Sequence, residues 1–513
     1  MGDLNSPQLL FKITLKRLSM TTLISHVYEH HEIKEKIKEI IRTKSTGQKA
    51  SFPMKPIKKE IIKLASQKIR ILELPKNLIG EMQGLLIFFA EKIASWAEFV
   101  TTSLELDMSY LDQIYWFHEG TIDVAKIFHE YWKTHRSFPS ISASNADNES
   151  FTSIMACKYA IEEIIFAHQD EIMKKVQKFL KNIPMPDVKN KADQIMAIYT
   201  CYMYGVGYDM THKADLHKKF QQTGNVNIQD MIFMCDGNAN AIKYLWNFLN
   251  KEEKDWIILQ LAFDNLRKGL WTGAFDFKGS GTGVIEFEMY NVAGYAAVVH
   301  FLINEMTVEQ RSEFFMHMAP KVIELFLRVW PYPELCLIML NDQTICEFII
   351  YDCPNVILPK LLNRMVHDFS NLVYVSGTCH YPSVFYELLT KILSLVPKDA
   401  KEMIFFEPSS CIKQGIKFPQ AIENFYHIFD VNALGIIIND KDLKRKRDLM
   451  ISMGSKKISW LLNRGNLKAV IKFIEKVLIS YEERKKFIKS WKLDDHVLVA
   501  DNLEIQGKIF VWL

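Results

Sequence analysis

Apolar residues along most of the chain recur with the spacing of one helix face. Between about residues 75 and 495, short segments carry apolar residues at i, i+3, i+4 and i+7, and strand-like alternation is rare. Brief polar or glycine-containing turns separate these segments. Clear examples are AIKYLWNFL, AAVVHFLINEM, KVIELFLRVW, VFYELLTKILSLV and AVIKFIEKVLI. The pattern predicts an all-α protein made of many short helices.

One pattern occurs more than once. The stretch GNANAIKYLWNFLNKEEKDWII, which starts at Gly237, aligns without a gap with GYAAVVHFLINEMTVEQRSEFF, which starts 57 residues later at Gly294. A third copy starts at Gly465 and fits after a two-residue insertion, and a weaker fourth starts at Val384. The positions that define the repeat are glycines, leucines and glutamates: Gly237, Gly294, Gly465, Leu245, Leu302, Glu252, Glu309 and Glu482.

Each copy has the same physical plan, which is a turn, an apolar helix, a short polar stop and a second helix. The second helix opens with Asn250, Thr307, Pro397 or Ser480. Asn, Thr and Ser can cap a helix with a side-chain oxygen, and Pro suits the first turn. Acidic residues two or three places later suit the positive end of the helix. The copies therefore predict an array of degenerate antiparallel helix pairs, an α-solenoid.

The segments GNLKAVIKFI and GNANAIKYLW resemble the helix-opening segment of ankyrin repeats, in which Gly-Asn or Gly-His precedes a small residue and an apolar run. The resemblance covers residues 235–495 and implies a helix-pair solenoid whose surface binds other proteins. The T-P-L-H opening of ankyrin repeats is absent, and the copies are 57, 90 and 81 residues apart rather than at multiples of about 33. A general array of helical hairpins is the alternative.

A glycine-rich stretch, FDFKGSGTGVIEFE, runs from Phe275 to Glu288. It does not match a phosphate-binding loop, because Lys278 precedes the glycines and a strand-like VIEFE follows them. We interpret residues 271–290 as an insertion between two repeats, a β-hairpin with GAFDF and VIEFE as its arms. Insertions of this kind often form part of a binding surface. The partner-binding residues predicted here are Phe275, Phe277, Lys278 and Thr282.

The chain divides into four parts at changes in composition. Residues 1–70 form a basic helical region, and residues 71–150 a helical region that ends in the polar stretch SFPSISASNADNES. Residues 151–495 form the repeat array, and residues 496–513 a C-terminal tail.

The composition is that of an ordinary globular protein, with 49% hydrophobic and 24% charged residues among 513. Disorder over most of the chain is therefore excluded. No apolar run is long enough to span a bilayer. The eight cysteines show no CxxC pair and lie mostly among apolar neighbours, which is typical of core thiols in a reducing compartment. We expect an intracellular protein, cytoplasmic rather than nuclear.

Charge is unevenly distributed although the net charge is only +3. Residues 1–70 hold fifteen Lys and Arg against six Asp and Glu. This asymmetry supports an alternative function, in which the basic N-terminal region binds nucleic acid or an anionic surface. A second basic cluster is a candidate nuclear import signal and consists of Lys444, Arg445, Lys446 and Arg447.

No set of catalytic residues assembles from the sequence. In HEYWKTH, His129 and His135 are six apart, whereas a zinc-binding HExxH places its histidines four apart on one helix face. Cys379 and His380 are adjacent and do not point at a common centre. The aromatic residues mostly occupy the apolar phase of their helices, which predicts core positions rather than base-stacking platforms. We expect a non-catalytic protein that binds a protein partner and has no cofactor or metal.

Overall fold

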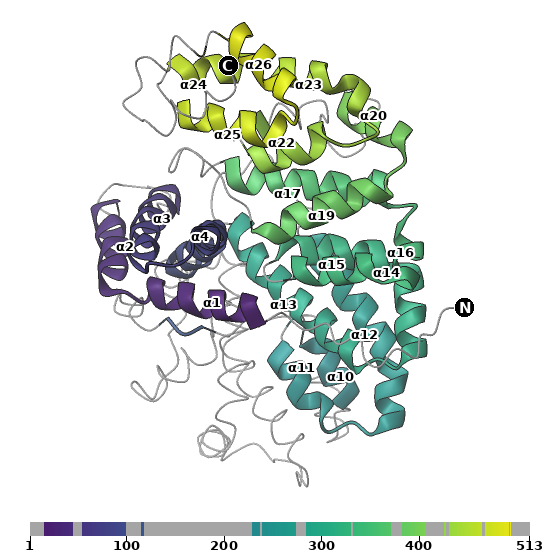
Figure 1. The fold of residues 1–513 in the computed structure, drawn as a ribbon. Helices are drawn as coiled ribbons and strands as arrows, with labels where there is room; N and C mark the ends of the chain where they lie inside the picture. Colours follow the sequence, from purple (N-terminus) through teal and green to yellow (C-terminus); the bar gives the residue numbers. More distant parts are fainter. Residues whose placement is uncertain are drawn as a thin grey trace, which may run out of the picture. The chain divides into compact units, whose positions relative to one another are not determined.

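The described part of the computed structural model is helical (Figure 1). It comprises residues 15–44, 54–98, 114–116, 228–235, 237, 239–272, 284–329, 332–370, 382–406, 425–426, 430–463, 467–491 and 493. No strand occurs within these ranges, and the all-α prediction is confirmed for them. Within the same ranges, no helix has an apolar stretch long enough to cross a bilayer.

The helices fall into three groups along the sequence. The N-terminal group is α1 (Leu15–Tyr28), α2 (His31–Lys44), α3 (Met54–Ile71) and α4 (Lys76–Glu98). The middle group is α10 (Ile228–Met234), α11 (Ala239–Trp246), α12 (Lys251–Thr272), α13 (Val284–Glu305), α14 (Val308–Arg328), α15 (Pro333–Asn341) and α16 (Gln343–Ile349). The C-terminal group is the π-helical turn η4 (Cys353–Ile357), α17 (Leu358–Ser370), α19 (Ser383–Leu395), α20 (Lys398–Phe406), α22 (Val431–Ile438), the 3-10 turn η6 (Lys444–Lys446), α23 (Arg447–Met453), α24 (Ser455–Asn463), α25 (Leu467–Val477) and α26 (Tyr481–Ser490).

The described residues belong to two compact units. The first unit takes residues from Met1–Ala65 and Phe88–Leu335, and the second takes residues from Ser66–Ile87 and Cys336–Leu513. The division after Leu335 lies inside the segment 151–495 that we interpreted as one array. Each unit is described separately below.

In the first unit, the helices α11 to α14 pack on one another. The helix α11 contacts α13, α12 contacts α14, α13 contacts α14, and the most extensive contact is between α12 and α13 (Figure 1). An edge-to-face contact between Phe263 and Phe314, with ring centroids 5.2 Å apart, joins α12 to α14. Leu245 of α11 and Leu302 of α13 are aligned in the repeat, and both are fully buried. The aligned apolar positions therefore serve the same purpose, which is to fill the core.

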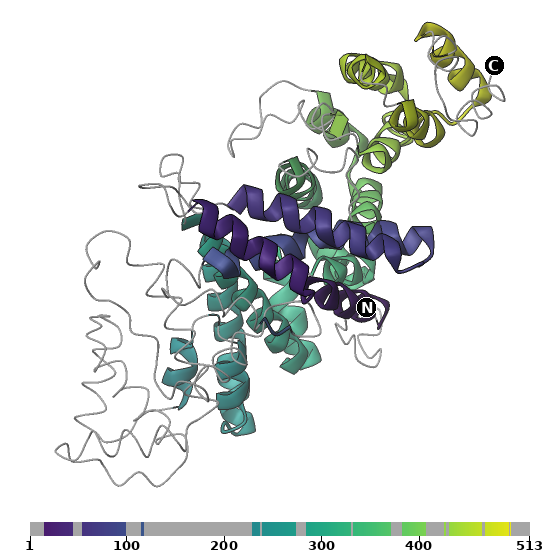
Figure 2. The same ribbon diagram turned by 90° about the vertical axis from the view of Figure 1, so that its left-hand side faces the viewer.

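In the second unit, α17 contacts α19, α19 contacts α22, and α22 contacts α25; these are the green to yellow helices in Figures 1 and 2. Their apolar residues lie at helical spacing on the buried faces, as at Val470, Phe473, Ile474 and Val477 of α25. Full burial of a side chain of this size stabilises a fold by about 1.5–3 kcal/mol. The segments that the sequence marked as amphipathic are thus the helices that make this core.

Two expectations from the repeat alignment are wrong. The segment VIEFE is not a strand arm, because it forms the first turns of α13. Gly294 is not in a turn but within the same helix, since α13 starts ten residues before it, whereas Gly237 does lie in a turn, at a φ of 69°. Alternation over five residues is short, and it was outweighed by the helical pattern that continues from it to Glu305.

Candidate interaction surface

The helices α12, α14 and α26 begin with the same hydrogen-bonded cap. At Asn250, the side-chain oxygen accepts a bond from the Glu253 N–H (2.9 Å), and the Glu253 carboxylate accepts one from the Asn250 N–H (2.8 Å). Thr307 with Gln310 makes the same reciprocal pair of bonds before α14. Ser480 does so before α26, with Glu483 as its partner. The predicted side-chain caps are therefore confirmed at all three positions.

A basic residue follows each cap position by four residues and is turned away from the solvent face of its helix. Arg311 donates from Nε to the Ile303 carbonyl and from Nη2 to the Met306 carbonyl, both at 3.1 Å, at the end of α13. Arg484 donates to the Leu478 carbonyl (2.8 Å) after α25, and Lys254 lies over the Trp246 ring. A cation near the last carbonyls of a helix is stabilising. The starts of α12, α14 and α26 are thus each held by a side-chain cap and by a basic side chain.

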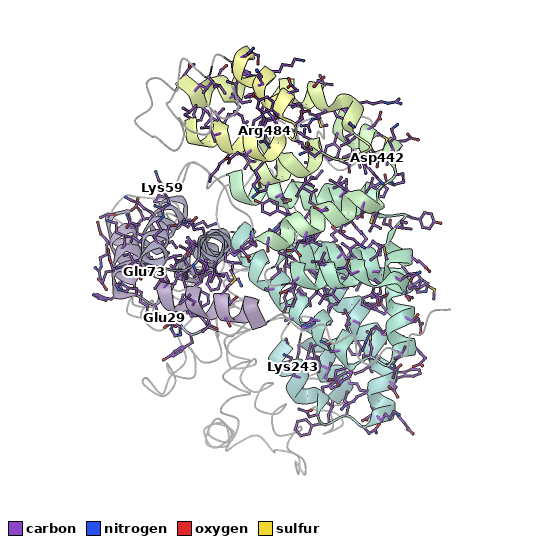
Figure 3. All side chains as sticks on the ribbon, viewed as in Figure 1. Glu29, Lys59, Glu73, Lys243, Asp442 and Arg484 are labelled. Atoms are coloured by element: carbon purple, nitrogen blue, oxygen red, sulfur yellow. The ribbon has the colours of Figure 1, made fainter. Side chains whose placement is uncertain are left out.

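The start of α20 is held in a different way. Pro397 directly precedes α20, and the basic residue four places later is Lys401, which is 1% exposed. Its ammonium contacts the carboxylates of Asp440 (2.9 Å) and Asp442 (2.5 Å) in the connection that follows α22. Figure 3 labels Asp442 at this edge of the second unit. These ion pairs therefore join α20 to the connection between α22 and η6.

The basic cluster KRKR is not a uniform exposed patch. Lys444 and Arg445 are exposed, whereas Arg447 is buried at the start of α23. Lys446 lies in η6, and its side chain is outside the described set. Arg447 forms a two-pronged ion pair with Glu483, with Nε–Oε1 at 2.9 Å and Nη2–Oε2 at 3.1 Å. A receptor for an import signal would therefore reach the first two residues but not Arg447.

The start of α22 holds a buried carboxylate. Asp430 is 1% exposed and accepts hydrogen bonds from the backbone N–H groups of Asn432 and Ala433. The Tyr386 hydroxyl of α19 donates to the same carboxylate at 3.1 and 3.2 Å. Burial raises the pKa of Asp430 to about 7, although these hydrogen bonds favour the ionised form. The α19–α22 contact thus contains a group that titrates near neutral pH.

We expect Asp430 to make the second unit less stable as the pH rises from about 4 to about 7. In this window the unfolded chain loses the proton while the folded chain keeps it, so the stability present at low pH is lost as the pH passes through the folded-state pKa. The difference between the ordinary pKa of 3.8 and about 7 limits the loss to about 4 kcal/mol. Asp430→Asn keeps the cap and removes the titration, so the hydrogen-exchange protection of the α22 amides, corrected for intrinsic exchange rates, should vary less between pH 5 and pH 8. The exposed Asp448→Asn is the control, and parallel pH profiles for Asp430→Asn and the unaltered chain would contradict the expectation.

The outer sides of α12 and α14 expose two large apolar side chains among carboxylates. We call this surface the α12–α14 face, and its members are Glu252, Asp255, Trp256, Gln260, Glu309, Glu313, Met316 and His317, all of which are exposed. Trp256 is 79% exposed and Met316 is 52% exposed. The Gln310 amide donates to the Asp255 carboxylate (3.3 Å) and so joins the two helices beside Trp256. Hydrogen bonds from its own backbone N–H and from the Thr307 hydroxyl lower the pKa of Glu309, which is therefore ionised at neutral pH.

The second unit also exposes aromatic side chains, but cations cover two of them. The Lys457 ammonium lies 4.0 Å from the centroid of the Trp460 ring, and Lys485 lies 5.7 Å from that of Tyr481. Tyr351 is 85% exposed in the turn before η4. A cation over a ring already uses part of the attraction that an aromatic offers to a basic partner.

Several cations of the basic N-terminal region are paired within their own helices. In α2, Lys36 contacts Glu39 and the buried Lys38 contacts Glu35, each at 2.8 Å. In α3, Lys63 lies 4.0 Å from Glu60. These neighbours reduce the positive field that the lysines offer to a phosphate group. Arg42 and Lys59 are exposed on the same two helices.

Three of the four described thiols are buried. Cys235, Cys336 and Cys353 are buried, Cys346 is half-buried, and none of the four forms a disulfide. Burial raises the pKa values of the Cys336, Cys346 and Cys353 thiols. Since a thiolate is the nucleophilic form, none of these three is activated for catalysis. Within the described ranges, no three His, Cys, Asp or Glu side chains are grouped so that they could hold a metal ion.

Several predicted residues lie outside the described ranges. They are the predicted partner-binding residues Phe275, Phe277, Lys278 and Thr282, together with Gly465 and the segments 137–150 and 496–513. The glutamates of the repeat do lie within these ranges, and Glu252, Glu309 and Glu482 are exposed in the first turns of α12, α14 and α26. Sequence reasoning missed Trp256. The signal was available, because Trp256 follows Glu252 by four residues and so lies on the polar stripe of its helix.

Comparison with known proteins gave no relative: no protein-family model, no curated protein and no solved structure matches the chain.

Proposed function

We propose that the chain is a non-catalytic protein that binds other proteins through the surface of an array of helix pairs. The observation that supports this is the recurrence of one corner, in which a reciprocal cap at Asn250, Thr307 or Ser480 is followed four residues later by a basic side chain directed at the end of the preceding helix. Two pairs that share this corner also pack first helix on first helix and second helix on second helix.

A single helix pair cannot bury its apolar side alone, so neighbouring pairs stack and form a continuous core. Stacking leaves a long exposed surface that one polypeptide partner can follow over several pairs. The α12–α14 face belongs to such a surface, and it exposes Trp256, a residue type that is common among the anchors of protein interfaces.

We propose a general helix-pair array rather than ankyrin repeats in particular. An ankyrin repeat is complete in about 33 residues. Here α13 and α14 alone contain 22 and 21 residues, so one pair exceeds the length of that unit.

The experiment is capture of partners by the full chain from a cell extract, with and without nuclease treatment, followed by cross-linking and mass spectrometry with the purified partner. We expect a stoichiometric protein whose cross-links map to consecutive helix pairs. A matched variant, Arg42→Glu with Lys59→Glu, removes two exposed cations of the N-terminal region and should leave this protein bound. Retention of nucleic acid or lipid alone, lost in the charge variant, would refute the proposal and favour the basic N-terminal region as the binding site.

A further inference from the structure

The α12–α14 face combines an exposed aromatic anchor with an excess of outward carboxylates. Its exposed carboxylates are Glu252, Asp255, Glu309 and Glu313, and Glu252 precedes Trp256 by about one helical turn. In the first two turns of α12 and α14 the basic residues are Lys251, Lys254 and Arg311. Lys254 lies over the Trp246 ring, and Arg311 donates to carbonyls at the end of α13. With Glu253 counted, the five carboxylates of these turns outnumber the three cations.

The helix starts account for part of this acidity but not for all of it. Glu252 and Glu309 lie in the first turns, where the partial positive charge of the helix end offsets their charge. Asp255 and Glu313 lie one turn further along and gain little from that end. Trp256 is 79% exposed, and within the described part of the chain its ring has no hydrogen bond, ring contact or cation above it. The face therefore offers both a negative field and an unused aromatic ring.

These properties select among possible occupants. A second copy of the chain would bring the same acidic face against itself, and nucleic acids and anionic membranes would meet the same repulsion. A segment rich in Lys and Arg is attracted by the carboxylates, and its guanidinium or ammonium groups can stack on an uncovered indole. Its apolar residues can cover the rest of Trp256 and Met316. We infer that the α12–α14 face binds a basic, partly apolar segment of a partner protein, with Trp256 as the anchor; this inference rests on the proposed function.

The test uses the full chain and a defined probe, a fluorescent 12-residue peptide of alternating Arg and Leu, with anisotropy measured at 50 and 300 mM NaCl. A peptide with Glu in place of every Arg is the charge control. We expect only the Arg peptide to bind, and more weakly at the higher salt concentration. Trp256→Ala should raise Kd about tenfold or more, as loss of an interface anchor does. The double variant Glu252→Gln with Glu313→Gln should raise it about threefold to tenfold.

The control variant is Trp460→Ala. It removes an exposed tryptophan of the second unit whose ring is already covered by the Lys457 ammonium. Its Kd should stay within about twofold of that of the unaltered chain. No binding of the Arg peptide, equal binding of the Glu peptide, or a Trp256→Ala variant that binds as well as Trp460→Ala would each overturn the inference. A failure of the proposed function would give a different experimental result from a failure of this site. If a captured protein partner binds Trp256→Ala undiminished, only this site is wrong, whereas the absence of any protein partner refutes the proposed function itself.

Discussion

Replacing Arg447 with alanine should destabilise the second unit by about 2–4 kcal/mol. The guanidinium donates five hydrogen bonds, which is the full number that an arginine side chain has. Two go to the Glu483 carboxylate, and one each goes to the Val477 carbonyl (2.7 Å), the Ile438 carbonyl (3.4 Å) and the Asn439 side chain. These acceptors lie at the ends of α22 and α25 and at the start of α26. One side chain thus joins three helices to α23.

The expected loss of stability depends on the Glu483 carboxylate, which loses its partner in the variant. Loss of one partner from a buried ion pair costs about 3–5 kcal/mol, because the other charge stays buried without compensation. The Glu483 side chain is 37% exposed, so water replaces part of the lost interaction and the cost is lower. The hydrogen bond from Arg447 and that from the Ser480 N–H hold the pKa of Glu483 below its usual range, although partial burial opposes them. In the variant the hydrogen bonds from Arg447 are lost and that from the Ser480 N–H remains.

The measurement is hydrogen exchange of the amides in α22, α25 and α26, since a chain of 513 residues with two units is not expected to unfold in one step. Arg447→Ala should reduce protection in all three helices, and Arg447→Lys should restore only part of it. Arg445→Ala is the matched control, because that residue is exposed two positions earlier. Its effect should stay within about 0.5 kcal/mol. Equal protection in the Arg447→Ala and Arg445→Ala variants would show that the five hydrogen bonds of Arg447 make no net contribution to stability.

The burial and contacts of Arg447 could not be predicted from the sequence. Hydrophobic periodicity identified the helices, and the residue types at Asn250, Thr307 and Ser480 identified three caps, because both signals depend on neighbours within one turn. In KRKR the four cations are equivalent by sequence. What distinguishes Arg447 is its contact with residues 30 and 36 positions later, and local spacing carries no information about such a pair.

The α12–α14 face is a second feature that the sequence did not predict. Carboxylates in the first turn of a helix are common for local electrostatic reasons, so Glu252 and Glu309 drew attention as marks of a repeat. Their place on a shared face with Trp256 depends on α14 lying beside α12. That contact is made by Phe263 with Phe314 and by Asp255 with Gln310, which are 51 and 55 residues apart in the sequence.

Substitution of Gly294 by alanine should destabilise the first unit by about 1–3 kcal/mol, the range for added atoms in a packed site. Gly294 lies within α13, where alanine alone would normally be favourable by about 1 kcal/mol. Here a methyl group would overlap the carbonyl oxygen of Gly237 and lie 3.2 Å from its carbonyl carbon. Because the obstacle is backbone, no rotation of a side chain relieves it. The repeat alignment paired these two glycines as equivalent positions, whereas they are in fact contact partners.

Gly237 cannot easily move aside. Its φ of 69° lies in the left-handed region that favours glycine, and its N–H donates to the side chain of Asn265 (3.4 Å), which is 3% exposed. Asn265 is fixed in turn by its bond to the Leu261 carbonyl within α12. A methyl group at position 294 must therefore displace α13 from the turn before α11 or distort that turn.

The matched control is Gly80→Ala in α4, where an added methyl group has no neighbour within 4 Å. This change should stabilise its helix by about 0.5–1 kcal/mol, because alanine is the better helix former and nothing opposes it. The two variants make the same chemical change inside a helix, so the opposite signs expected in hydrogen exchange isolate the cost of the contact with Gly237. If Gly294→Ala instead raised protection in α13 as Gly80→Ala should in α4, the close crossing would not limit this position, and the glycine there would need another explanation.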